Sequence, residues 1–374
     1  MYRDFRRLGL CGEERDKPRR KPAVKEQEIR EIFDNQGEAC ERLGSPFTGR
    51  LCRLAGKRLA QGGAVADVIL GWRGDASALG DSVPLRLAGA LHALVIKGRS
   101  LLLAAVYPPN HEAVTDEALW AAIAAALRTE EAFILDRLTG PPQTNEVRRI
   151  GATLPMFLEV ARRTGLPLVL SEVGASAGLN LFLDRYHVIL GEQSWGDPAA
   201  AVHHAPKWRG EAAPVGDLTI ADRAGCDLLP VDPGNPADRE RMLSFIWADQ
   251  QDRLDRTRAA LDIAAASPIR VEKADAIDWL ARCTATPMQG VAHVIYSTIA
   301  WQYIPKAARD EGEAIIRAAG ARATTDAPLA WARMEIDGKT PGTGLTLALW
   351  PTGEEHLVGR ADFHGRWIDW YGWP

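Results

Sequence analysis

The 374-residue chain has little of what marks specialised protein classes. Its cysteines are few, and no two form a C-x-x-C pair: Cys11, Cys40, Cys52, Cys226 and Cys283. This pattern argues against a disulfide framework or a structural zinc site, and a reducing, cytoplasmic location is expected. A formal net charge of -4 provides no field that would attract nucleic acid or an anionic membrane. No apolar run reaches the roughly 18 residues that a membrane helix needs.

Residues 1–27 are rich in Arg, Lys, Asp and Glu and lack the apolar core of a signal peptide. Because acids and bases are mixed there, we expect a charged, disordered tail rather than a basic binding arm. Residues 28–165 show helical periodicity, including one long helix from Asp116 to Leu138. Another helix is predicted to begin within Thr144-Asn145-Glu146-Val147 and to run to Gly165. These residues are expected to form an α-helical N-terminal domain or lid.

After residue 166, short β-prone runs alternate with helical stretches, which is typical of an α/β fold with a mostly parallel sheet. Strands are predicted at 168–173, 218–222 or an extended 218–226, 269–272, 292–297, 329–335, 343–350 and 356–363. Pro351-Thr352-Gly353 predicts an antiparallel hairpin between the last two strands. We therefore expect a second domain over 166–374, with an insertion near 191–216 that is rich in Trp and Pro.

The segment from Ser171 to Asn180 has the pattern of a strand end, a glycine-rich turn and a helix start. Glu172 closes the strand, and Gly174 and Gly178 would let the backbone approach a ligand closely. Free N–H groups at the following helix N-terminus would favour polar or anionic ligand groups. In an open α/β sheet, a nucleotide-like ligand binds beyond the carboxyl end of the first strand.

The same turn also fits G-x-S-x-G, the nucleophile elbow of serine hydrolases, with Ser176 as the nucleophile. His364 and either Asp326 or Asp337 would complete the order Ser, acid, His. This alternative needs several strands before the turn, whereas the residues before 166 have a helical pattern. It also leaves the acid at Glu172 without a role.

Polar and aromatic residues follow the later strands. Asp227 could hold ribose hydroxyls, with Asp232 as a near competitor, although both lie well beyond the usual interval of about 20 residues from the glycine turn. Asp275 could accept a hydrogen bond from the exocyclic amine of adenine, or it could simply cap the helix predicted at 276–282. The aromatic residues of Trp301-Gln302-Tyr303 could line the ligand crevice or pack against the following helix.

In chain order, Glu172-x-Gly174, Asp227-Leu228-Leu229-Pro230, Asp275-Ala276 and the segment Ser297 to Pro305 resemble the motifs of class I S-adenosylmethionine-dependent methyltransferases. The resemblance covers residues 166–370. It implies that family's Rossmann-like sheet, with the terminal hairpin as its reversed last strand. It also implies these cofactor contacts: Glu172, Gly174, Ala175, Ser176 and Gly178 at the methionine part, Asp227 at ribose, Asp275 and Ala276 at adenine, and Ser297 at the sulfonium. Ser176 stands where that motif has glycine, and the interval before Asp227 is long.

Across the whole chain, four segments resemble a bacterial family known only as a domain of unknown function: Gln143-Thr144-Asn145-Glu146, 172–181, Gly225-Cys226-Asp227 and Trp301-Gln302-Tyr303. Membership implies a methyltransferase-like fold without an assigned substrate.

The expected activity is methyl transfer from S-adenosylmethionine to a small molecule. A non-catalytic protein that binds this cofactor or another nucleotide is an alternative. The candidates for a base are His364, Glu146 and Tyr303. The candidates for substrate contact are Asn145, Trp301 and Gln302. No metal is expected, because His203-His204 has no acid or cysteine at ligand spacing.

Overall fold

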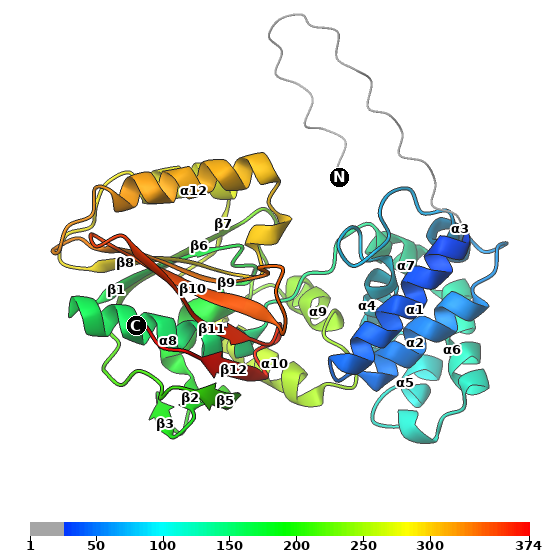
Figure 1. Ribbon diagram of the computed structural model, residues 1–374. Helices are drawn as coiled ribbons and strands as arrows, with labels where there is room; N and C mark the ends of the chain where they lie inside the picture. The colour runs from blue at the N-terminus through cyan, green and yellow to red at the C-terminus, as the bar shows by residue number, and fades with distance from the viewer. Residues whose placement is uncertain (1–25) are drawn as a thin grey trace, which may run out of the picture.

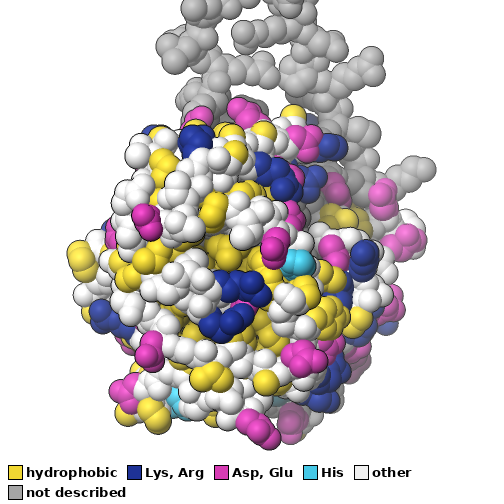
Figure 2. Space-filling view, turned by 60° about the vertical axis from the view of Figure 1, so that its left-hand side comes forward, with side chains coloured by type: hydrophobic (Ala, Val, Ile, Leu, Met, Phe, Trp, Pro, Cys, Tyr) yellow, Lys and Arg dark blue, Asp and Glu magenta, His cyan; other side chains and the backbone are white. Residues whose placement is uncertain are grey.

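The computed structural model describes residues 26–374. Residues 1–25 of the expected tail at 1–27 lie outside the described residues, and the first helix begins at Glu26. A helical half and a half built on a β-sheet lie side by side (Figure 1). Figure 2 shows basic and acidic side chains interspersed among hydrophobic ones, with one small basic group near the centre of that face. No helix within residues 26–374 is both long and apolar enough to cross a membrane.

Residues 26–138 are helical, as the sequence predicts, and their buried side chains form a core of their own. The elements are α1 (Glu26–Arg42), α2 (Pro46–Arg58), α3 (Ala64–Leu70), α4 (Val83–Ile96), α5 (Leu101–Val106), the 3-10 helix η1 (His111–Ala113), α6 (Asp116–Thr129) and α7 (Glu131–Leu138). The prediction of one helix from Asp116 to Leu138 is wrong, because Glu130 has non-helical dihedral angles and its carboxylate pairs with Arg99 at 2.7 Å. The break lets α7 pack on α4 while α6 packs on α5.

The helix predicted to begin near Thr144 begins later. The 3-10 helix η2 (Val147–Arg149) leads into α8 (Ile150–Thr164), and residues 141–146 are not helical. The side chain of Glu146 accepts a hydrogen bond from the backbone N–H of Arg148 at 3.1 Å, which caps η2. α8 packs against the sheet and shares its core, whereas the helical pattern of 28–165 predicts that it belongs to the N-terminal domain.

The central sheet has nine strands among the described residues. They are β1 (Leu168–Val173), β5 (Lys207–Gly210), β6 (Ile220–Asp227), β7 (Glu272–Lys273), β8 (Ala292–Thr298), β9 (Leu329–Glu335), β10 (Thr343–Trp350), β11 (Glu354–Ala361) and β12 (Trp367–Trp370). Their order is β5-β12-β11-β10-β9-β8-β1-β6-β7. β7, β6, β1, β8 and β9 are parallel, and β10 is antiparallel to β9 and β11. Five parallel strands followed by an antiparallel hairpin are therefore confirmed.

Alternation along the strands divides the side chains between two helix-covered faces. On one face, Leu170 and Tyr296 pack into the core that includes α8. On the other, Val173 and Ile295 pack with side chains of α11 (Ala276–Cys283) and α12 (Lys306–Gly320). Figure 1 shows α12 above the sheet and α8 below it. The remaining helices are η3 (Leu179–Arg185), α9 (Pro236–Ser244), α10 (Gln251–Ala265) and η4 (Trp301–Tyr303).

Two parts of the sheet half differ from the sequence prediction. The strand predicted at 269–272 is displaced to Glu272 and Lys273, which pair with Cys226 and Asp227 at the end of β6. The insertion predicted near 191–216 already begins with β2 (His187–Leu190), which pairs with β3 (Gln193–Trp195) and β4 (His203–His204) in a small sheet. Its last strand, β5, joins the main sheet beside β12.

The two halves are joined at the start of α2. Asp249, in the loop between α9 and α10, accepts hydrogen bonds from the Ser45 hydroxyl and, at 2.9 Å, from the backbone N–H of Phe47. Ser45 is fully buried and does not cap α2 with its own side chain. A carboxylate from the sheet half therefore caps a helix of the helical half.

We predict that Asp249→Ala lowers the free energy of unfolding by about 1–2 kcal/mol, because it leaves a helix N–H and a buried hydroxyl without an acceptor. Urea denaturation followed by circular dichroism measures the change. Asp255→Ala is the matched control, because Asp255 is exposed on α10 and its contacts, with Arg258 and Gln251 at 2.8 Å each, lie within that helix. Equal stability of the two variants would show that the Asp249 cap contributes nothing.

Candidate functional site

The parallel strands bring the predicted cofactor residues to one edge of the sheet. Val173 is the register partner of both Cys226 and Ser297, and Asp227 is the partner of Lys273. The residues after these positions therefore leave the sheet at the same carboxyl edge. The linker at 139–146 crosses this edge, since the Gln143 side chain donates to the carbonyl of Leu229 at 2.7 Å. β1 lies between β6 and β8, where the chain changes direction across the sheet.

The glycine turn after β1 adopts left-handed conformations. Gly174, Ser176 and Gly178 have φ values of 72°, 55° and 71°. Most of its N–H groups are already bonded within the protein. Those of Gly174 and Ala175 donate to the carbonyl of Cys226, both at 3.0 Å. That of Ser176 donates to the Asp227 carboxylate at 2.9 Å.

The helix expected after the turn is the 3-10 segment η3, with non-helical dihedral angles at Phe182. Arg223 from β6 holds this segment, donating to the carbonyl of Leu181 at 2.7 Å and pairing with Asp184. The backbone N–H of Leu179 donates to the Asn145 side chain at 2.8 Å. The expected cradle of free N–H groups at an α-helix N-terminus is therefore wrong. This segment is fastened to β6 and to the linker.

The space over the glycine turn is closed by neighbouring side chains. A Cβ added to Gly174 would lie 2.5 Å from the Cβ of Ala300, and one added to Gly178 would lie 3.0 Å from Val271. Ala300 follows Ile299, a β-branched residue with φ of 53°, which is a strained conformation. Glu335 holds this β8 exit turn by accepting from the N–H groups of Ala300 and Trp301, at 3.1 and 3.2 Å.

Glu172 lies beneath the turn, on the face of the sheet that α8 covers. Its side chain is 1% exposed and accepts a hydrogen bond from the Tyr296 hydroxyl at 3.0 Å. Burial raises the pKa of this carboxyl to about 8, against the lowering effects of Tyr296, Asn180 and Arg149. Glu172 is therefore largely protonated at neutral pH, and a cation placed nearby would ionise it.

The two other predicted acids have roles within the protein. Asp227 accepts from the N–H groups of Ser176 and Leu229, both at 2.9 Å, and so ties the turn after β6 to the turn after β1. Asp275 caps α11, accepting at Oδ1 from Ile277 and Asp278 at 2.8 and 3.4 Å. α11 covers the face opposite Glu172, so the carboxylates of Asp275 and Glu172 do not face each other. Ala276 is the first residue of α11.

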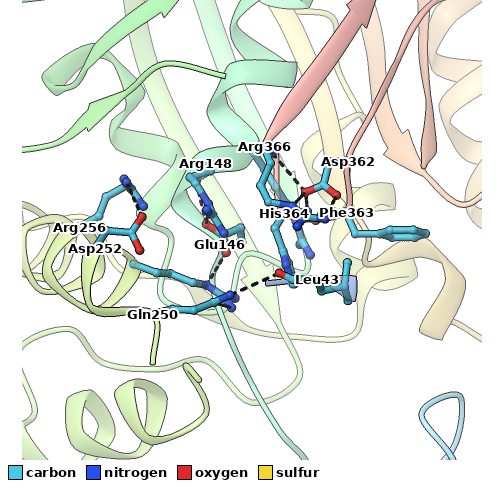
Figure 3. A network of polar contacts seen from close by, with 12 residues as sticks. Leu43, Glu146, Arg148, Gln250, Asp252, Arg256, Asp362, Phe363, His364 and Arg366 are labelled. Carbon is cyan, nitrogen blue, oxygen red and sulfur yellow. Dashed lines mark hydrogen bonds and ion pairs between the residues drawn. The ribbon is translucent and has the colours of Figure 1, made fainter. Parts of the chain in front are cut away.

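A cluster of arginines lies where the linker meets α10 and the loop at 362–366 (Figure 3). Glu146 is 2% exposed and pairs with Arg253 at 2.5 Å and with Arg148 at 3.1 Å. Burial opposes its ionisation, but these two charges outweigh burial and hold the pKa of Glu146 far below its ordinary value. Arg149 instead donates to the carbonyls of Thr298 and Phe363, at 2.8 and 3.1 Å. Within residues 26–374, Arg149 has no carboxylate at ion-pair distance.

The three candidate bases differ in their surroundings. Glu146 is fixed as an anion between two arginines and is a poor proton acceptor. Tyr303 is 69% exposed in η4. Burial and the charge of Arg253 lower the pKa of His364 to about 3, so its ring is neutral at physiological pH. Its Nδ1 is buried without a hydrogen-bond partner among the described residues, and the ring packs edge-on against Trp247.

The candidate substrate residues are placed unequally. Asn145 is buried and holds the N–H of Leu179, so its carbonyl is occupied. Trp301 packs against Trp331, with ring centroids 5.6 Å apart, and belongs to the core under α12. Gln302 is different, because its amide oxygen is buried without a partner in the described part of the chain. The Ser176 hydroxyl is likewise buried and unpartnered, so it makes no hydrogen bond to His364.

A cavity of about 190 Å³ opens beside the adenine end of the predicted site. It lies where the linker, the β6 exit loop and α9 meet β7, and it is lined by Gln143, Leu229, Pro230, Val231, Asp238, Arg241, Met242 and Lys273. Arg241, Lys273, Arg149 and Glu335 are not among the site residues predicted from the sequence. A basic residue two positions before Asp275 was a usable signal for Lys273, whereas Arg149 and Arg241 lie in helical patterns that look like ordinary solvated faces.

Ser297, the predicted sulfonium contact, is buried at the end of β8. Its exposed fraction is 1%, and it lies beside Glu335. His203 contacts His187, with the two Nδ1 atoms 3.2 Å apart. Within the described chain, no group of three or more His, Cys, Asp or Glu side chains is arranged to hold a metal ion.

A family model described as an uncharacterized protein conserved in bacteria, DUF2332, matches residues 30–370. The chain therefore belongs to this bacterial family. Neither a search of curated proteins nor a search of solved structures returned a significant match.

We predict that Glu172→Gln stabilises the protein at neutral and alkaline pH. A carboxyl with a folded-state pKa near 8 favours folding below about pH 4.5, and this contribution is lost as the pH rises to 8. The variant should gain on the order of 2–4 kcal/mol in the free energy of unfolding at pH 8, and far less at pH 4.5. Urea titrations across this range measure the difference, and a pH-independent difference would contradict the buried, protonated state of Glu172.

Proposed function

We propose that this DUF2332 protein is an S-adenosylmethionine-dependent methyltransferase that acts on a small molecule. The observation that carries the proposal is the position of the Gly174–Gly178 turn, at the carboxyl end of β1 between β6 and β8. In α/β sheets this crossover point is where nucleotide-like ligands bind. The parallel order of the five strands and the reversed β10 support the class I likeness, although β12 and β5 extend the sheet further.

The polar groups at this edge suit such a cofactor. Ser176 follows β1 and Gln302 follows the neighbouring strand β8. The Ser176 hydroxyl and the Gln302 amide oxygen are both buried without hydrogen-bond partners within residues 26–374. Unpaired buried polar atoms are uncommon and call for an explanation such as a missing ligand. Glu172 would ionise beside the cationic methionine part, and Oδ2 of Asp275 is not used in the α11 cap. The cavity beside Lys273 offers space next to that adenine end.

The bound cofactor would supply an electrophilic methyl group. The chain's own contribution would be alignment of the substrate nucleophile and exclusion of water, for which the linker and the helical half lie close to the edge. His364 would be the base if the nucleophile arrives protonated, since it is neutral and its Nδ1 is unpaired. The low pKa of His364 makes it a weak base. It could therefore accept a proton only from a nucleophile that becomes strongly acidic as the methyl group is transferred.

Access to Gly174 requires the β8 exit turn to move. Ala300 covers the glycine, and the strain at Ile299 lowers the cost of leaving this closed arrangement. We propose that cofactor binding displaces Ala300 from its position over Gly174. The displacement of Ala300 would reconcile the close packing over Gly174 with a cofactor site at this turn.

Two alternatives differ in their outcomes. A non-catalytic binding protein would bind S-adenosylmethionine tightly and transfer no radiolabelled methyl group to small molecules of a cell extract. A serine hydrolase would be labelled at Ser176 by a fluorophosphonate probe. The structure disfavours this reaction, because the Ser176 hydroxyl is buried and His364 does not hydrogen-bond to it.

We predict that Asp275→Asn and Glu172→Gln each weaken S-adenosylmethionine binding at least tenfold in isothermal titration calorimetry. Asn keeps the Oδ1 that caps α11 and replaces only the free acceptor, so stability should not change. Glu172→Gln should weaken binding although it stabilises the fold, which a purely structural role would not produce. Asp278→Asn, on the exposed surface of the same helix, is the control. Wild-type affinity in both test variants would place the site elsewhere.

We further predict that Ala300→Gly tightens S-adenosylmethionine binding several-fold, because it removes the methyl group that covers Gly174. Ala300→Val should weaken binding by a similar factor through greater steric closure. Calorimetry measures both, and circular dichroism verifies that each variant is folded. Affinities that do not follow side-chain size would contradict displacement of this residue by the cofactor.

A further inference from the structure

A second cavity, of about 300 Å³, lies between the small sheet, α10 and the loop at 362–366. Its lining is rich in basic and imidazole side chains: Arg148, His187, Ile189, His203, His204, Ala205, Asp252, Arg256 and Arg366. None of these residues belongs to the predicted cofactor set. The cavity is much larger than a single oxyanion and therefore has room for an organic substituent.

Three arginines reach this cavity from three segments (Figure 3). Arg148 comes from η2, Arg256 from α10 and Arg366 from the loop that precedes β12. Contacts within the protein hold each side chain. Arg256 donates to the carbonyl of His203 at 3.0 Å, and Arg366 makes two hydrogen bonds to Asp362, at 2.9 and 2.7 Å. These guanidinium groups are therefore positioned before any ligand arrives.

Two guanidinium nitrogens of this set lack an acceptor. Nη2 of Arg148 and Nη1 of Arg256 are buried and make no hydrogen bond within the described residues. The two side chains are only 12% and 16% exposed. A buried charged donor without an acceptor is costly, and its usual explanation is a bound ion, water or ligand.

The charges around the cavity leave an excess of positive charge. Glu146 is shared by Arg148 and Arg253, so this group of three carries one more cation than it has anions. Asp252, the one acidic side chain in the lining, pairs with Arg256 at 3.3 Å and is 65% exposed. Screening by water weakens that pair, so the cavity favours an anion.

We propose that this cavity binds the phosphoryl group of a small phosphorylated molecule, through the guanidinium groups of Arg148, Arg256 and Arg366 that line it. Guanidinium groups that approach from separate segments match an anion that accepts hydrogen bonds in several directions, as tetrahedral phosphate does. A planar carboxylate fits better in the single plane of one guanidinium fork. The site goes beyond methyl transfer and does not depend on it.

Inorganic phosphate is the probe, titrated into the full chain by calorimetry at constant ionic strength. We expect saturable binding that Arg256→Gln weakens at least tenfold. Arg258→Gln, which changes an exposed arginine of the same helix that pairs with Asp255, should bind as the wild type does. Equal binding by Arg256→Gln and the wild type would overturn the proposal, as would the absence of saturable binding to the wild type.

Ile189→Glu is a second variant that does not touch the arginine network. Ile189 is 39% exposed on the small sheet and lines the cavity, so the new carboxylate would repel phosphate without disturbing a core. We expect a loss of phosphate binding with an unchanged urea midpoint. Acetate in place of phosphate should bind at least tenfold more weakly, and equal binding would overturn the phosphoryl assignment. Glu172→Gln should leave phosphate binding intact, which separates this site from the proposed cofactor site.

Discussion

The buried carboxylate of Glu146 is the group around which the candidate site is organised. It is almost fully removed from water, and a buried anion is tolerated only where opposite charges and hydrogen bonds replace its hydration. Arg148 and Arg253 supply that replacement from η2 and from α10. The adjacent Arg149 donates hydrogen bonds to a carbonyl of the loop at 362–366 and to a carbonyl at the end of β8. The Glu146 ion pairs therefore join the linker, η2 and α10, and the neighbouring Arg149 ties η2 to the C-terminal loop and to the end of β8.

The two-residue alternation of the strands sets a second constraint on this edge. Glu172 points to the α8 face, whereas Asp275 begins a helix on the opposite face. A ligand that contacts both must therefore lie across the end of the sheet rather than against one side of it. The proposed cofactor, which is elongated with a cationic end and an aromatic end, would take such a position.

The strands that the sequence predicts best are short apolar runs between turn residues, as in β1, β9 and β10, because local burial and pairing demand the same pattern. The position of β7 could not be predicted, since it depends on pairing with the last two residues of β6, which are distant in sequence. The 3-10 segment after the turn depends on Arg223 and Asn145, which are distant in sequence. The positions of Glu172, Asp227 and Asp275 at one edge followed from strand order alone. Arg149 and Arg253 did not, because their partners come from other elements.

The two outer strands of the main sheet share one property. β7 consists of Glu272 and Lys273, and β5 at the other margin carries Lys207 and Arg209, with Arg209 paired to Asp369 of β12. Unpaired backbone at a sheet margin can template the addition of a strand from another molecule. Short edge strands that carry charged side chains disfavour that addition. The segment at 187–210 ends in β5, which pairs with β12 and so covers the backbone edge of that strand. We infer that this pairing makes edge-to-edge association of two molecules less favourable.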